Sequence, residues 1–181
     1  MPPAESSALP ASGAGVRGAV VTAVSVAVAV AVLVRYGATG RGIVAASLAA
    51  LLVTLSAIDL EHRILPNALV LPAIAVALPA QMLVDPGRWL EWTLGAFGAA
   101  LVLLLPLAAG RAGVGMGDVK LAFLLGLVLG ESVVLAVLLA SFAVLPVALG
   151  LLLRHGGEAL RMGVPFGPFL SLGAIVALLA G

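Results

Sequence analysis

The chain lacks cysteine and carries little charge. Without cysteine it has no disulfides, no Cys-ligated zinc and no thiol nucleophile. Charged residues make up 9% of the 181 residues, whereas a soluble domain carries about 25%. Hydrophobic residues reach 63% and the mean hydropathy is +1.28, which indicates an integral membrane protein. Aromatic residues are few as well, and the abundant small residues let transmembrane helices approach closely.

Positive charge is also scarce. The net charge is +1 and no basic cluster occurs, so nucleic acid is not an expected partner. The lipid bilayer is the expected surroundings of this chain.

Seven apolar runs follow one another along the sequence. They cover residues 18–34, 42–58, 68–84, 89–109, 119–129, 132–153 and 166–180. We therefore predict an all-α, polytopic integral membrane helix bundle of six to seven transmembrane helices. Residues 1–17 are expected to be a flexible tail, and residues 18–181 a single membrane-embedded domain. The first run is expected to be an uncleaved span, with a signal peptide as the alternative.

The number of transmembrane helices stays open because one apolar run is short. A span needs about 20 residues, and the run 119–129 falls below this length, so it is expected to be a half-helix or to continue into the next run across Gly130 and Glu131. Trp89 and Trp92 flank the fourth run, as interfacial anchors do.

Two polar segments interrupt the apolar sequence, and each contains an aspartate. They read DLEHRILPN over residues 59–67 and GVGMGDVK over residues 113–120. Ionisable groups at membrane boundaries are costly and are functional by default. A carboxylate pair supports peptide hydrolysis when one group takes a proton from water and the other, protonated, hydrogen-bonds the carbonyl. Asp59 and Asp118 are the candidate catalytic pair.

The local sequence suggests how the pair divides its proton. Asp59 ends an apolar run, where the helix macrodipole disfavours negative charge, whereas Asp118 starts a helix and is expected to act as its N-cap. Our hypothesis is that Asp118 holds the charge and Asp59 more often holds the shared proton. The roles would be swapped if Asp118 lay in the drier, less hydrogen-bonded place.

The residues around Asp118 have accessory roles in this interpretation. Gly113, Gly115 and Gly117 remove side chains where the backbone must turn and approach a substrate strand. Lys120 either neutralises the carboxylate pair or contacts a lipid phosphate. Neither His62 nor His155 forms a recognised metal motif, so we expect no metal site.

These motifs together resemble a known family. An aspartate at a helix end followed by HRILPN, then GMGDVKL, then PFGP over residues 165–168, is similar to the type IV prepilin peptidases, membrane aspartyl proteases of the Gly-x-Gly-Asp class. The resemblance covers roughly residues 42–180. It implies Asp59 and Asp118 as the catalytic pair, with Gly115 and Gly117 matching the glycines before the second aspartate. It also implies cleavage of short basic leaders from prepilins or pseudopilins at the cytoplasmic face, without a cofactor.

Within that family the chain resembles the short peptidases of tight-adherence (Flp-type) pilus systems, or a compact archaeal-type preflagellin peptidase. Larger members have a cytoplasmic segment with paired cysteines and also methylate the new amino terminus. Since this chain has no cysteine, methyltransferase activity is not expected.

Orientation follows from the basic residues of alternate loops. The side with both aspartates receives six, at positions 17, 63, 111, 120, 154 and 161, and the other side receives three, at 35, 41 and 88. The excess predicts a multi-pass inner (plasma) membrane protein whose aspartates face the cytoplasm. Asp85, in an Asp-Pro-Gly turn, falls on the opposite face and is excluded from the site.

Two alternatives stay open. One is a non-enzymatic transporter or assembly subunit that uses the aspartates as a proton or cation relay. The other is a presenilin-like protease that cuts within the membrane, although Ile58-Asp59 replaces the Tyr-Asp of those enzymes. The sequence leaves the oligomeric state open.

Overall fold

The computed structural model describes residues 12–108, 115–156 and 165–180. These residues form α-helices joined by short turns, and no strand occurs in the described ranges. The α-helices are α1 (Ser12–Tyr36), α2 (Gly40–His62), α3 (Asn67–Val84), α4 (Trp89–Ala108), α5 (Met116–Leu129), α6 (Val133–His155) and α7 (Gly167–Ala180). Two 3-10 helices, η1 (Pro86–Arg88) and η2 (Gly130–Ser132), precede α4 and α6. The predicted all-α class is confirmed.

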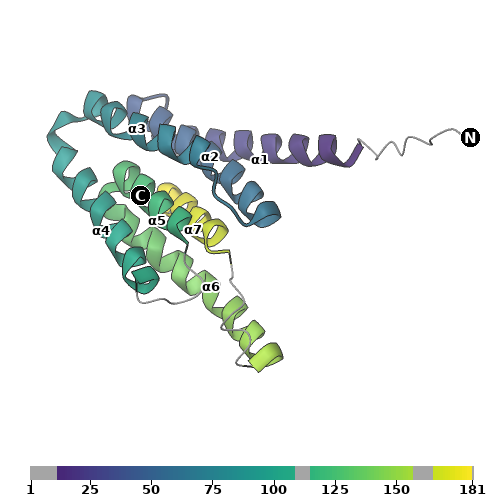
Figure 1. The fold of residues 1–181 in the computed structure, drawn as a ribbon. Coiled ribbons are helices and arrows are strands. Elements are labelled where there is room, and N and C mark those ends of the chain that lie inside the picture. The colour runs from purple at the N-terminus through teal and green to yellow at the C-terminus, as the bar shows by residue number, and fades with distance from the viewer. Residues whose placement is uncertain (1–11, 109–114, 157–164, 181) are drawn as a thin grey trace, which may run out of the picture.

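The helices are long and apolar enough for a polytopic membrane protein. Among the described residues, five stretches qualify as spans by length and composition: Gly15–Tyr36, Gly40–His62, Asn67–Val84, Pro86–Ala108 and Met116–Arg154. The last stretch contains both α5 and α6, and Figure 1 shows α6 returning in the direction opposite to α5. The short run therefore ends in η2 rather than continuing straight into α6. Helix α7 is apolar but shorter, with 14 residues.

The outer surface has the character of a lipid-facing surface. Large apolar side chains point outward along several helices; Val34, Leu83 and Leu153 are 82%, 88% and 79% exposed. In water, such an apolar surface would promote association. Leucines of α2, α5 and α7 fill the interior instead, where Leu52, Leu121 and Leu170 are fully buried.

The helices of the bundle pack mainly in pairs: α1 against α2, α4 against α5, and α6 against α7 (Figure 1). Helix α2 also packs against α7, and α3 packs against α5. The buried side chain of Gln81 joins α3 to α5, because its Nε2 donates a 2.8 Å hydrogen bond to the carbonyl oxygen of Val128.

Small residues let the helices of the pairs α4–α5 and α6–α7 approach closely, as is common in membranes. A Cβ atom placed on Gly126 of α5 would collide with the backbone of Gly95 and Ala96 in α4. A Cβ atom on Gly173 of α7 would likewise collide with the carbonyl oxygen of Ala136 in α6. These contacts fix the lateral positions of α5 and α7, the two helices whose first residues form part of the site below.

Two details differ from the sequence expectations. Helix α1 already begins at Ser12, inside the segment expected to be a flexible tail, and residues 1–11 lie outside the described range. Of the two tryptophans expected at the interface, Trp89 is half exposed, but Trp92 is only 3% exposed and packs inside the bundle. Trp92 lies against η2, because a Cβ atom placed on Gly130 would be 3.2 Å from Trp92 Cδ1.

Candidate active site

Asp59 lies in the last turn of α2. The helix ends at Arg63, which adopts the left-handed conformation (φ 54°) and donates its backbone N–H to the carbonyl oxygen of Asp59 at 2.8 Å. This cap satisfies one of the terminal carbonyls of the helix. The Asp59 side chain points into the bundle, and the residue is only 5% exposed.

Asp118 lies in the first turn of α5. The N-cap is Gly115, so Asp118 is the third helical residue rather than the N-cap that the sequence suggested. Its Oδ2 accepts a 2.9 Å hydrogen bond from the backbone N–H of Gly115, and its own N–H donates to the Gly115 carbonyl oxygen at 3.1 Å. The carboxylate therefore occupies the positive end of the helix dipole while being 8% exposed.

Gly167, the first residue of α7, lies against the Asp59 carboxyl group. A Cβ atom on Gly167 would lie 2.6 Å from Asp59 Oδ2 and 3.6 Å from Leu65 Cδ1. In the sequence analysis the segment 165–168 was only one of the motifs that carry the family resemblance. In the structure this glycine makes room for a candidate catalytic group. The match to the family's Pro-Phe-Gly-Pro pattern was the signal that singled it out.

Leu65 connects the surroundings of the two aspartates. A Cβ atom on Gly117 would lie 3.1 Å from Leu65 Cβ, so the missing side chain of Gly117 lets Leu65 pack beside α5. Leu65 therefore has the Asp59–Gly167 contact on one side and the residue preceding Asp118 on the other. The fold thus brings both predicted aspartates to one end of the bundle.

The hydrogen bonding of the two carboxyl groups differs. Asp59 Oδ2 is buried and makes no hydrogen bond within the part of the chain that the structure describes, although the backbone N–H of Gly167 lies near the carboxyl group. Asp118 has its bond from Gly115. A buried charge without hydrogen bonds is costly, so this bond favours the negative charge on Asp118. Swapped roles were expected if Asp118 lay in the drier, less hydrogen-bonded place; Asp118 has the hydrogen bond, and both residues are buried, with 8% and 5% exposed. Which aspartate carries the proton stays a prediction.

Lys120 links the two polar segments. Its Nζ donates a 2.9 Å hydrogen bond to Oδ1 of Asn67, the first residue of α3. In the sequence analysis Asn67 was named only within the polar segment 59–67, and Lys120 was expected to neutralise the carboxylates or to contact a lipid phosphate. Gly115 is the N-cap of α5, and Gly113 lies outside the described residues.

Asp85 lies away from this cluster. It caps the C-terminal end of α3 and forms an ion pair with Arg41 of α2. Since Asp59 is near the end of α2 and Arg41 near its start, the pair is at the opposite end of the bundle.

Comparisons with known proteins identify the family of the chain. The sequence profile of the type IV leader peptidase family matches residues 46–149, from α2 into α6, and includes both aspartates. Similar curated proteins are named prepilin leader peptidase/N-methyltransferase. The protein from Pseudomonas putida is 34% identical over 81% of this chain, that from Burkholderia pseudomallei (strain 1026b) 33% over 92%, and that from Bacillus subtilis 27% over 82%.

The chain is shorter than these relatives. The aligned regions cover 53%, 56% and 60% of the three proteins, so this chain spans little more than half their length. No solved structure matches the fold.

Proposed function

Because the chain belongs to the type IV leader peptidase family, we propose that it is a membrane aspartic endopeptidase. Its substrates are prepilin- or pseudopilin-like proteins, from which it removes a short basic leader at the cytoplasmic face. The observation that carries the proposal is the convergence of Asp59 and Asp118 around Leu65, at the end of the bundle where α7 begins. The names of the curated relatives support the choice of substrate.

The chemistry follows from the two environments. Asp118, ionised, takes a proton from a water molecule as the water oxygen attacks the scissile carbonyl carbon. Asp59, protonated, donates a hydrogen bond to the carbonyl oxygen, on which negative charge develops. As the tetrahedral intermediate collapses, the C–N bond breaks and the proton on Asp118 passes to the leaving amine. Water is the nucleophile, and the residues present supply every proton transfer.

The start of α7 contributes to holding the negative charge. Its first residue contacts the Asp59 carboxyl group, and the N-terminus of α5 holds Asp118. Two helix N-termini therefore face the pair, and their dipoles favour one shared negative charge there. A second negative charge so close would be opposed by repulsion, which keeps one proton on the pair.

The cytoplasmic orientation rests on the distribution of basic residues. Arg17 pairs with Glu61 at 3.6 Å, so the start of α1 lies at the same end as Asp59. Arg63 and Lys120 also belong to this end, whereas Arg41 and Arg88 are at the other. The excess across the full sequence favours the aspartate end as cytoplasmic.

The relay alternative is not favoured, since the family match and the relatives' names both concern leader peptidases. The relatives' names also include N-methyltransferase; the proposal for this chain concerns the peptidase step.

The direct test is leader removal from a co-expressed prepilin-type substrate, followed on a gel. The variants are Asp59→Asn and Asp118→Asn, and the control is Asp85→Asn at the opposite end. Loss of a general acid or base costs about 10²–10⁴-fold in rate, so both motif variants should leave the substrate uncleaved while the control processes it. Cleavage by either motif variant at the wild-type rate would refute the catalytic pair.

A further inference from the structure

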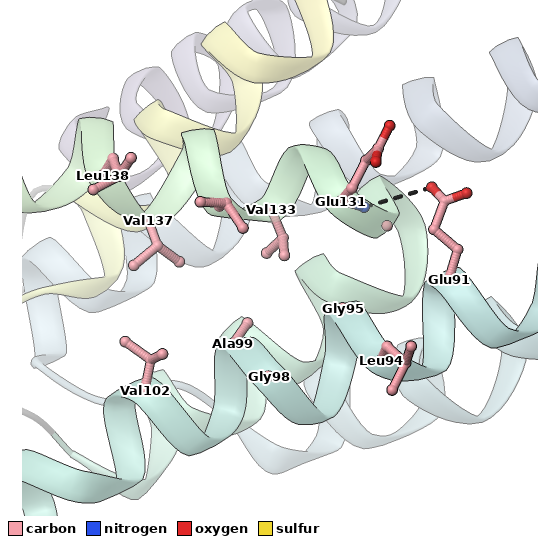
Figure 2. Close-up of a pocket in the computed structure, with 12 residues that line it drawn as sticks. Glu91, Leu94, Gly95, Gly98, Ala99, Val102, Glu131, Val133, Val137 and Leu138 are labelled. Carbon is pink, nitrogen blue, oxygen red and sulfur yellow. Dashed lines mark hydrogen bonds between the residues drawn. The ribbon is translucent and has the colours of Figure 1, made fainter.

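An open apolar groove runs between α4 and α6. Its volume is about 550 Å³, within the range of roughly 300–1,000 Å³ typical of small-molecule sites. Figure 2 shows Ala99 and Val102 of α4 facing Val133 and Val137 of α6 across the groove. One end of the groove is formed by the start of α4 and by η2. Since η2 follows the last residue of α5 and Asp118 lies in the first turn of α5, this end of the groove lies away from the aspartates.

Small residues on α4 leave this groove unfilled by the protein. A Cβ atom placed on Gly98 would find nothing within 4 Å, so a side chain there would point into open space. One turn earlier, Gly95 is occupied differently: a Cβ atom there would lie 2.7 Å from the carbonyl oxygen of Gly130. The part of the groove beside Gly98 is therefore free for a molecule from outside the chain.

The length of the groove matches one leaflet. Its lining on α4 extends from Glu91 to Val102, and at about 1.5 Å per residue these eleven steps cover roughly 16 Å. Half of the hydrocarbon core is about 15 Å thick. The groove thus begins at the polar boundary and ends near the bilayer centre, which is the extent of one acyl chain.

The polar end of the groove carries charges of both signs. Glu91 receives two hydrogen bonds from Arg88, at 2.7 Å and 2.5 Å, and its Oε1 lies 3.5 Å from the backbone nitrogen of Glu131 (Figure 2). The Glu131 carboxylate is exposed and has no ion pair within the described residues. Of these charged residues only Glu91 and Glu131 line the groove, and Arg88 neutralises Glu91, so the exposed Glu131 carboxylate favours a ligand that brings a cation.

We propose that this groove binds a zwitterionic phospholipid with a primary ammonium headgroup, of the phosphatidylethanolamine type. One acyl chain lies over Gly98 between α4 and α6. The ammonium group donates to the carboxylate of Glu131, which lines the polar end of the groove. A quaternary ammonium cannot donate such hydrogen bonds, and an anionic headgroup would be repelled by the two carboxylates.

The test uses the purified full chain in detergent with added phosphatidylethanolamine, phosphatidylcholine or phosphatidylglycerol of identical acyl chains. At several times the dissociation constant, phosphatidylethanolamine should raise the thermal midpoint by about 2–4 °C for a chain of this size. The other two lipids should raise it less. Native mass spectrometry of the same samples counts the lipid molecules that stay bound.

Two variants locate the site. Gly98→Leu fills the groove and should abolish the shift, whereas the matched control Gly150→Leu, at another helical glycine with nothing within 4 Å of a Cβ atom, should keep it. Glu131→Gln should keep the binding of an acyl chain but make phosphatidylethanolamine and phosphatidylcholine equivalent.

Equal shifts from all three lipids in the wild-type chain would overturn the headgroup assignment. An undiminished shift in Gly98→Leu would overturn the groove as the site. If the wild-type chain is a dimer and Gly98→Leu is a monomer that still binds the lipid, the groove is the interface with a second copy of the chain instead. None of these readouts depends on leader cleavage, so they test lipid binding independently of the peptidase function.

Discussion

Gly167 and Asp59 are in direct contact: the first residue of α7 lies so close to the carboxyl group at the end of α2 that a Cβ atom would lie 2.6 Å from Oδ2. An acidic side chain and a helix start far apart in the sequence thus determine each other's position. The contact makes a residue without a side chain part of the site.

Gly167→Ala should therefore reduce cleavage strongly. The added methyl group displaces the Asp59 carboxyl, and a misplacement of about 1 Å costs on the order of 10²-fold in rate. Leader cleavage with purified components measures the effect. Gly150→Ala, where a Cβ atom meets nothing within 4 Å, is the control and should cleave normally. Wild-type activity of Gly167→Ala would mean that the Asp59 position tolerates this shift.

The two asparagine variants should differ in stability at pH 7. If Asp59 carries the proton, Asp59→Asn replaces one neutral group by another and changes the unfolding free energy little. Asp118→Asn removes a negative charge from the first turn of α5 and weakens its bond from Gly115, which costs about 0.5–1.5 kcal/mol. The thermal midpoints of the two variants show which of them is less stable. The opposite order would place the charge on Asp59.

The hydrogen bond between Lys120 and Asn67 should appear as an energetic coupling. A double-mutant cycle with Lys120→Met and Asn67→Ala should give a coupling of about 0.5–1 kcal/mol, since the bond is exposed and joins α5 to α3. Unfolding of the four proteins in one detergent measures it. Strict additivity would favour the alternative in which Lys120 contacts a lipid phosphate.

Gly126→Ala should destabilise the bundle by roughly 1–3 kcal/mol, because the methyl group meets the backbone of α4 and cannot be accommodated by a side-chain movement. Gly98→Ala should do the reverse and stabilise by about 0.5–1 kcal/mol, because it improves helix propensity in open space. The pair of thermal midpoints tests whether α4 and α5 are as close in solution as in the structure.

The helices could be predicted because each of them corresponds to one continuous stretch of apolar sequence. A membrane span needs a long apolar run, and the predicted run 68–84 differs from α3 by one residue at its start. The positions of Asp59 and Asp118 near helix ends also follow from the polar segments that interrupt the runs. That the two residues are catalytic stays a prediction for the cleavage experiment.

What could not be predicted depends on helices that pack together in space. Trp92 belongs to the interior because of the neighbours of α4, which composition does not specify. The partner of Lys120 is 53 positions away, and an exposed lysine has many alternatives. The contact of Gly167 with Asp59 requires α7 to fold back beside α2, and a glycine in a Pro-rich segment gives no direction for that.

The order in which the helices leave the ribosome has a consequence for the proposed carboxylate pair. Asp59 is on α2, which packs against α7, and Asp118 is on α5, which packs against α3. A chain synthesised only as far as η1 contains Asp59 but lacks the helix that carries Asp118 and the glycine that lies against the Asp59 carboxyl group. The proposed pair is therefore complete only after the last helix has been made and has packed against α2.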